Sequence, residues 1–261
     1  VQSALSIPDR EKEIQESRSL TNINDSFKKV IIVINSGATI DCEYFAENEK
    51  VQGVLFGWQG GMEGGSAIAD LLCGDVNPSG KLVDTIAKSY DCYPCKADFW
   101  ECFDHVDYSD DIYVGYRYFE TIPDAYKNVR YPFGFGLSYT KFQLSGKVCL
   151  EREGKIFAMV DVKNIGNVAG KEVIELYYSA PQGKLGKPSK ELAAFKKTKL
   201  LAPGESETLV LSFDVNNMAS FDDLGKIQKS AYILEKGEYK FYLGTSVRDN
   251  EKLEFEYILN D

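Results

Sequence analysis

The second half of the chain carries the pattern that most limits its fold: short segments in which apolar and polar residues alternate. Turn sequences such as Asn164-Ile165-Gly166-Asn167 and Ala202-Pro203-Gly204 separate these segments. About seven or eight such strands in ~120 residues are typical of an immunoglobulin-like β-sandwich. The sequence predicts strands at residues 142–150, 156–164, 171–179, 190–200, 207–213, 231–234, 239–244 and 253–259.

The first half has a different pattern, in which buried strands are followed by loops and helices. Val30–Ile34 is an unbroken β-branched run, and Val54–Phe56 is a second apolar run that leads through glycines into a helix expected at residues 66–72. Runs of this kind are used by parallel sheets that are buried on both faces. We therefore expect an α/β domain, with ligands at the loops that follow the strands, residues 35–37 and 57–65.

The glycines of the second loop are Gly60, Gly61, Gly64 and Gly65. A glycine-rich loop before a helix can cradle a phosphate through its backbone N–H groups. Here no Lys followed by Ser or Thr stands at the spacing of a phosphate-binding loop. The sequence therefore favours tight packing of this loop over phosphate binding.

Composition limits the partners of the chain. The 261 residues suit two domains, and 30 basic against 40 acidic residues give a net charge of −10. This balance does not favour nucleic acid or an anionic membrane as a partner, and no apolar run is long enough for a membrane span. The N-terminus lacks an initiator Met and a signal peptide pattern. We expect a piece of a longer, cytoplasmic polypeptide.

One irregular segment holds residues that could ligate a metal. Cys92, Cys95, Cys102 and His105 could supply the four ligands of a zinc site. No second Cys pair follows, so free thiols in a reducing compartment are the favoured interpretation, and we predict no metal site. A nearby acidic group has two interpretations as well, a hard-cation site or a solvated loop, and we favour the loop. Its members are Asp104, Asp107, Asp110 and Asp111.

Several motifs in one order resemble the C-terminal half of glycoside hydrolase family 3, the β-glucosidase-type enzymes. In the first half these are VIIVINSG (30–37), GWQGGMEGGSAIADLLCGDVNPSGKL (57–82), IYVGYRYFE (112–120) and YPFGFGLSYT (131–140). In the second half, residues 162–181 and 191–206 resemble the fibronectin type III-like domain of that family. The resemblance implies an α/β sandwich domain at residues 1–133, a linker at 134–140 and a fibronectin type III-like sandwich at 141–261.

The resemblance also implies a mechanism that this chain does not complete. Enzymes of this type are retaining glycosidases that use two carboxyl groups, and in the family the nucleophilic Asp lies on a TIM barrel. We expect no barrel in this chain, because nothing in it resembles eight strand-helix units and its length leaves no room for them beside the two predicted domains. The acid/base Glu of the family commonly precedes a Gly-x-Asp-Arg sequence. Aligning Asp9 and Arg10 with that Asp-Arg places Ser6 at the acid/base position, and a Ser hydroxyl is too weak an acid for this role.

We therefore predict no catalytic residue in this chain, and contacts to substrate from Trp58, Glu63, Asp9 and Arg10. Glu63 has an equally favoured alternative role, as a charge at a helix N-terminus. The resemblance implies a β-glucoside or oligosaccharide as substrate, a TIM-barrel domain as partner and no cofactor. We therefore predict that the chain is part of a retaining β-glucosidase-type enzyme. We expect the chain by itself to be inactive. The alternative is a truncated or degenerate, non-catalytic family member that serves as a structural module or as a module that binds sugar or a partner.

Overall fold

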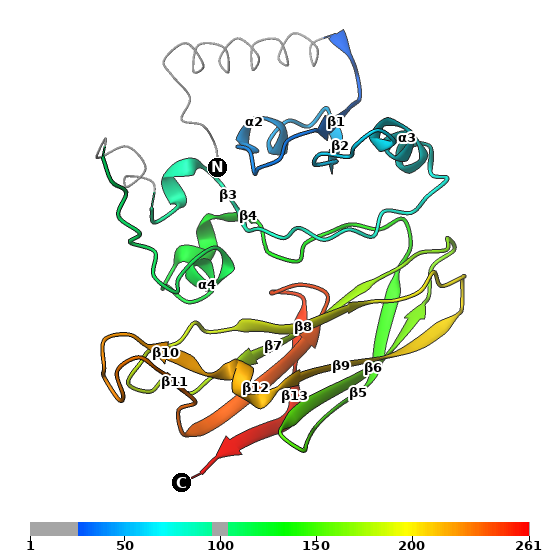
Figure 1. The fold of residues 1–261 in the computed structure, drawn as a ribbon. Coiled ribbons are helices and arrows are strands. Elements are labelled where there is room, and N and C mark those ends of the chain that lie inside the picture. The colour runs from blue at the N-terminus through cyan, green and yellow to red at the C-terminus, as the bar shows by residue number, and fades with distance from the viewer. Residues whose placement is uncertain (1–25, 96–103, 261) are drawn as a thin grey trace. The chain divides into compact units, whose positions relative to one another are not determined.

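The computed structural model describes residues 26–95 and 104–260 (Figure 1). The described residues divide into two compact units. Unit 1 comprises residues 26–75 and 88–90, and unit 2 comprises residues 76–87 and 91–260. No helix among the described residues is both long enough and apolar enough to cross a membrane.

Unit 1 is built on one parallel strand pair. Strand β1 (Val30–Ile34) pairs with β2 (Val51–Phe56), and helix α2 (Glu43–Ala46) lies between them in the sequence. Helix α3 (Gly64–Cys73) follows β2 and ends at Gly74, which has φ of 84° and whose N–H donates to carbonyls of the last turn. A left-handed residue at this position is the usual end of a helix and suits glycine. The predicted helix is confirmed and begins two residues earlier than expected.

One expectation for β1 is wrong, namely that both of its faces are buried. Ile34 is buried, whereas Ile31 is 56% exposed and Val33 is 37% exposed. The physical reason is that the parallel sheet contains only β1 and β2 in the described part of the chain. A second covering layer would be needed to bury alternate residues on the other face.

The first part of unit 2 is short and irregular. Strands β3 (Ile86–Ala87) and β4 (Val129–Tyr131) form an antiparallel pair. Between them in the sequence lie the short helices α4 (Tyr116–Phe119) and η2 (Ala125–Asn128); η1 (Tyr90–Cys92) lies at the boundary between the two units. A small apolar cluster holds this part together, and its buried members are Ala87, Phe119, Ala125 and Val129.

The rest of unit 2 is an antiparallel β-sandwich (Figure 1). One sheet has the order β5-β6-β9, formed by Phe142–Arg152, Lys155–Asn164 and Ser206–Asp214. The other sheet has the order β13-β12-β7-β8, formed by Asn250–Leu259, Gly237–Gly244, Val173–Ser179 and Glu191–Lys197. The short helix η3 (Val215–Met218) and a hairpin of β10 (Ser220–Asp222) and β11 (Ala231–Ile233) complete it.

Alternation of side chains explains the core of this sandwich. On β6, every second residue from Ile156 to Val162 is fully buried, and the residues between them point away. Both sheets contribute inward-facing residues to one apolar cluster, including Leu176 of β7, Leu211 of β9 and Phe241 of β12. This is the arrangement that the alternating sequence predicts for two packed sheets.

Candidate functional site

The candidate site lies in unit 1, where the two parallel strands end. A cavity of about 330 Å³ is lined by residues that follow β1 and β2 and by the start of α3. The N–H of Gly57 donates to the carbonyl of Ile34 at 2.9 Å, so the two strand ends lie side by side. In open α/β sheets, ligands bind at this carboxyl edge. The lining residues are Asn35, Trp58, Gln59, Gly60, Gly61, Gly64, Gly65 and Ile68.

Close backbone approaches shape the loop between β2 and α3. A Cβ atom on Gly60 would lie 2.8 Å from the Cα of Gly64, and a Cβ atom on Gly37 would lie 2.9 Å from the Nε2 atom of Gln59. Neither position has room for a larger side chain without a shift of its neighbours. Of the four loop glycines, only Gly60 shows the expected tight packing, because a Cβ atom on Gly61, Gly64 or Gly65 would meet nothing within 4 Å. The side chain of Gln59 lies against Gly37, in the loop that follows β1.

Trp58 is the most unusual residue of this loop. Its φ is 50°, in the left-handed region that a bulky L-residue rarely adopts. The ring is half-buried and packs near the Phe56 ring, with 5.9 Å between the two centroids. Strained backbone of this kind persists where the surroundings enforce it, and it gathers at ligand sites. The strained loop places Trp58 in the cavity lining.

The other predicted contacts are distributed differently. Glu63 is exposed, precedes α3 and makes no side-chain cap hydrogen bond, and it does not belong to the cavity lining. Ser6, Asp9 and Arg10 lie outside the described residues. Sequence reasoning placed the cavity at the strand ends but did not single out Gln59 and Ile68. Ile68 falls within the helix expected at residues 66–72, whereas nothing in the sequence places Gln59 against Gly37.

The residues considered for metal binding form no metal-binding group in the part of the chain that the structure describes. Within residues 26–95 and 104–260, no group of three or more His, Cys, Asp and Glu side chains has the closeness that a metal ion requires. His105 is exposed, with its Nδ1 atom 2.9 Å from Oδ1 of Asp104 and its Nε2 atom 4.0 Å from Oδ2 of Asp107. Cys102 lies outside the described residues.

A strand-end cavity in a parallel β-α-β unit, followed in the chain by an antiparallel β-sandwich, defines the class by its fold: an α/β module joined to a fibronectin-like module. The chain belongs to glycosyl hydrolase family 3. The model of the glycosyl hydrolase family 3 C-terminal domain matches residues 5–139, and that of the fibronectin type III-like domain matches residues 172–247.

Relatives of the chain are β-glucosidases. It is 50% identical over 260 residues to β-glucosidase A of Butyrivibrio fibrisolvens, and the alignment covers 94% of this chain and 31% of that protein. It is 43% identical to a β-glucosidase of Ruminococcus albus, covering 89% of this chain and 24% of the relative. Among solved structures, a β-glucosidase of Paenibacillus barengoltzii is similar with a TM-score of 0.86 and 45% identity, covering 94% of this chain and 27% of that one. The chain thus spans about a quarter to a third of the length of these proteins.

Proposed function

We propose that this chain forms part of a retaining β-glucosidase-type enzyme and that its strand-end cavity borders the sugar site of that enzyme. The observation that carries the proposal is the strained Trp58 in the lining of a cavity at the carboxyl ends of β1 and β2. The similarity to β-glucosidases along 94% of the chain supports this substrate class. A TIM-barrel domain of the same enzyme would supply the nucleophilic carboxylate and the pocket for the terminal sugar.

The role proposed for Trp58 is binding rather than chemistry. An indole ring offers a flat apolar face to a sugar ring, and its N–H can donate to a hydroxyl. Such a contact made equally in the ground state and the transition state changes KM and leaves kcat nearly unchanged. The acid/base and nucleophilic steps would belong to carboxyl groups about 5–5.5 Å apart, as retention requires.

The test uses a polypeptide in which this chain is joined to a family 3 barrel domain, assayed on an aryl β-glucoside. We expect hydrolysis, and we expect Trp58→Ala to raise KM by about tenfold, since truncating a buried aromatic contact typically costs more than 1 kcal/mol. Phe195→Ala, which truncates an exposed ring on β8, is the control and should leave KM unchanged. Failure of the joined polypeptide to hydrolyse any of several aryl glycosides would refute the enzyme proposal.

Ser6, at the position aligned with the acid/base Glu, favours a second candidate function, a non-catalytic module that binds sugar or a partner domain. Calorimetric titration of the chain with glucose, cellobiose and xylose tests this candidate. Binding by the chain, together with an inactive joined polypeptide, would support the module. The absence of both sugar binding and hydrolysis would leave a purely structural role.

A further inference from the structure

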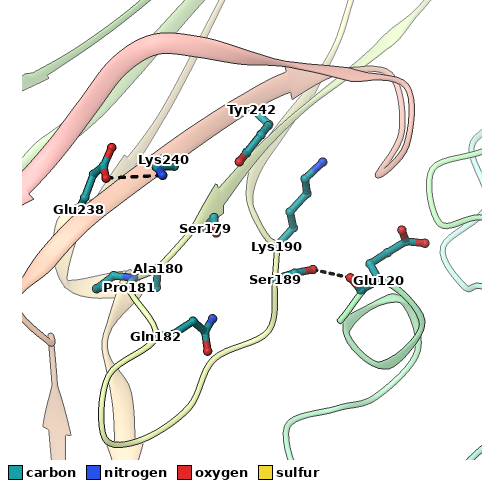
Figure 2. A pocket seen from close by; sticks show the side chains of 10 residues that line it. All are labelled: Glu120, Ser179, Ala180, Pro181, Gln182, Ser189, Lys190, Glu238, Lys240 and Tyr242. Carbon is teal, nitrogen blue, oxygen red and sulfur yellow. Dashed lines mark hydrogen bonds and ion pairs between the residues drawn. The ribbon is translucent and has the colours of Figure 1, made fainter. Parts of the chain in front are cut away.

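A second concave site lies entirely within unit 2, on the outer face of the four-stranded sheet (Figure 2). Its volume is about 680 Å³, within the range of about 300–1,000 Å³ typical of small-molecule sites. Strand β12 supplies one side through Glu238, Lys240 and Tyr242, and the segment after β7 together with Glu120 supplies the other. We call this site the sandwich groove.

The loop that forms one wall of the sandwich groove is fixed by a buried carboxylate. Glu235 is 8% exposed, and its two oxygens accept the N–H groups of Lys184 at 2.6 Å and Leu185 at 3.3 Å. Within the loop, the amide of Gln182 donates to the carbonyl of Lys187 at 3.1 Å and accepts from the N–H of that residue at 3.3 Å. A wall held in this way loses little conformational freedom when a ligand binds.

Glu120, on the same side of the groove, is tied to this loop. The Ser189 hydroxyl donates to the carbonyl of Glu120 at 2.7 Å, and the Ser189 N–H donates to the hydroxyl of Thr121 at 2.8 Å. The Glu120 carboxylate accepts from the Arg248 guanidinium through Oε1, at 2.8 Å from Nε. These contacts join segments more than 60 residues apart and set the width of the groove.

Polar side chains that line the groove are held in place by their neighbours but can still form hydrogen bonds with a ligand. The Lys190 ammonium lies 4.4 Å from the centroid of the Tyr242 ring and donates to Oδ1 of Asn250 at 2.9 Å. This contact holds the ring, and no hydrogen bond of the Tyr242 hydroxyl is seen within the described ranges. Lys240 lies 3.5 Å from a Glu238 oxygen, so its ammonium retains donors for a ligand.

The charges of the groove balance. Among the lining residues, two carboxylates, Glu120 and Glu238, match two ammonium groups, Lys190 and Lys240. Arg248, which pairs with Glu120, does not line the groove. A neutral ligand therefore fits better than an anion or a cation. Acceptors, donors and a hydroxyl in one groove suit a molecule with many hydroxyl groups, because each sugar hydroxyl can both donate and accept. We propose that the sandwich groove binds a neutral oligosaccharide.

The test is calorimetric titration of the 261-residue chain with cellotetraose, xylotetraose and maltotetraose in turn. We expect at least one of them to bind. Tyr242→Phe removes one hydroxyl and keeps the ring, so we expect it to weaken binding by about fivefold, the effect of one hydrogen bond. The double variant Lys240→Ala with Tyr242→Ala should lose binding. Tyr232→Ala is the matched control, because Tyr232 is 77% exposed on the β10–β11 hairpin, and it should bind as the unaltered chain does.

The outcome distinguishes this proposal from the function proposed for unit 1. Binding that is lost in Trp58→Ala but kept in the groove variants would assign the sugar to the strand-end cavity and overturn the groove proposal. No binding of any of the three tetrasaccharides, or equal binding by the groove variants, would overturn it too. Thermal unfolding of Tyr242→Phe and of the unaltered chain is the control for folding. If both unfold at the same temperature, any loss of oligosaccharide binding in Tyr242→Phe is not caused by misfolding.

Discussion

At the scale of single residues, Glu175 on β7 is a buried carboxyl group whose ionisation lowers the free energy of unfolding. It is 4% exposed, accepts a hydrogen bond from the Tyr177 hydroxyl and packs against the backbone of Gly134. Burial raises its pKa from 4.5 to about 7, against the opposing effects of the Tyr177 hydrogen bond and the Lys81 ammonium. Gly134 has φ of 80° and no space for a Cβ atom beside this carboxyl group. The side chain thus fits its site best when it is protonated.

The direction of the resulting pH dependence follows from this raised pKa. The protonated Glu175 side chain stabilises the folded chain fully below pH 4.5, and this stabilisation is lost as pH rises through about 7. The reason is that Glu175 loses its proton at a lower pH in the unfolded chain than in the folded one. A shift from 4.5 to about 7 corresponds to about 3 kcal/mol in the free energy of unfolding. Glu175→Gln keeps the shape without the ionisation. We expect it to match the unaltered chain near pH 4 and to exceed its stability at pH 8 by up to about 3 kcal/mol.

Urea unfolding at pH 4 and pH 8 measures this difference. Glu254→Gln, the same change at an exposed position of β13, shows what the substitution does by itself. An equal difference between Glu175→Gln and the unaltered chain at both pH values would contradict the prediction.

At the scale of elements, the turn after β6 depends on one buried amide. Asn164 is fully buried, and its Oδ1 atom accepts from the Thr140 hydroxyl at 2.7 Å and the Gly166 N–H at 3.1 Å. Its Nδ2 atom donates to the carbonyls of Val168 at 2.8 Å and Leu201 at 2.9 Å. All four bonding positions of the amide are used, so the residue joins the turn to two distant segments.

Replacing this amide should therefore destabilise the sandwich strongly. Asn164→Ala leaves several buried polar groups without partners, and we expect a loss of about 2–4 kcal/mol in the free energy of unfolding. Asn167→Ala provides a matched control in the same turn, since Asn167 is exposed, and should change stability by less than about 0.5 kcal/mol. Denaturant unfolding of both variants is the measurement, and equal effects would show that the amide network is not what holds the turn.

The same elements show what the sequence can predict about the fold. All eight predicted strands of the sandwich are confirmed within a few residues. In β6 and β9, burial of one face imposes an alternation on the chain, whereas β7 is a run of five buried residues. Strand β10 (Ser220–Asp222) was not predicted, since three residues are too few for such a pattern. The sequence does not predict the exposure of Ile31 and Val33. An apolar run indicates that a strand can be buried on both faces, but it does not show which other elements of the chain cover those faces.

For the candidate site of unit 1, the sequence predicts where the site lies in the chain but not the geometry of its residues. The rule that ligands lie at the carboxyl ends of parallel strands located residues 35–37 and 57–65. The left-handed backbone of Trp58 depends on how its loop packs, and no residue type indicates it. The sandwich groove was not foreseen at all, because it joins Glu120 to residues about 60 to 120 positions later in the chain. The contribution of Asp9 and Arg10 stays a prediction.

At the scale of the whole molecule, the two units differ greatly in how much apolar surface they bury. In the described part of unit 1, the buried apolar side chains are Ile34, Cys42 and Phe45, whereas unit 2 has a continuous core drawn from both sheets of the sandwich. Local stability follows buried apolar contact, so regions with little of it open more readily than the rest of a protein. We therefore expect unit 1 to open without unit 2.

Hydrogen exchange measured by mass spectrometry on the 261-residue chain tests this difference. Amides of β1 and β2 should exchange on the order of 100-fold faster than those of β6 and β7, corresponding to about 3 kcal/mol of local stability. Phe45→Ala removes one of the few buried rings of unit 1 and should accelerate exchange in β1 and β2 alone. Phe241→Ala, the matched change in the sandwich core, should act on β6 and β7 and leave β1 and β2 as they were. Equal exchange in the two units, or acceleration of both by either variant, would mean that the chain unfolds as a single cooperative body.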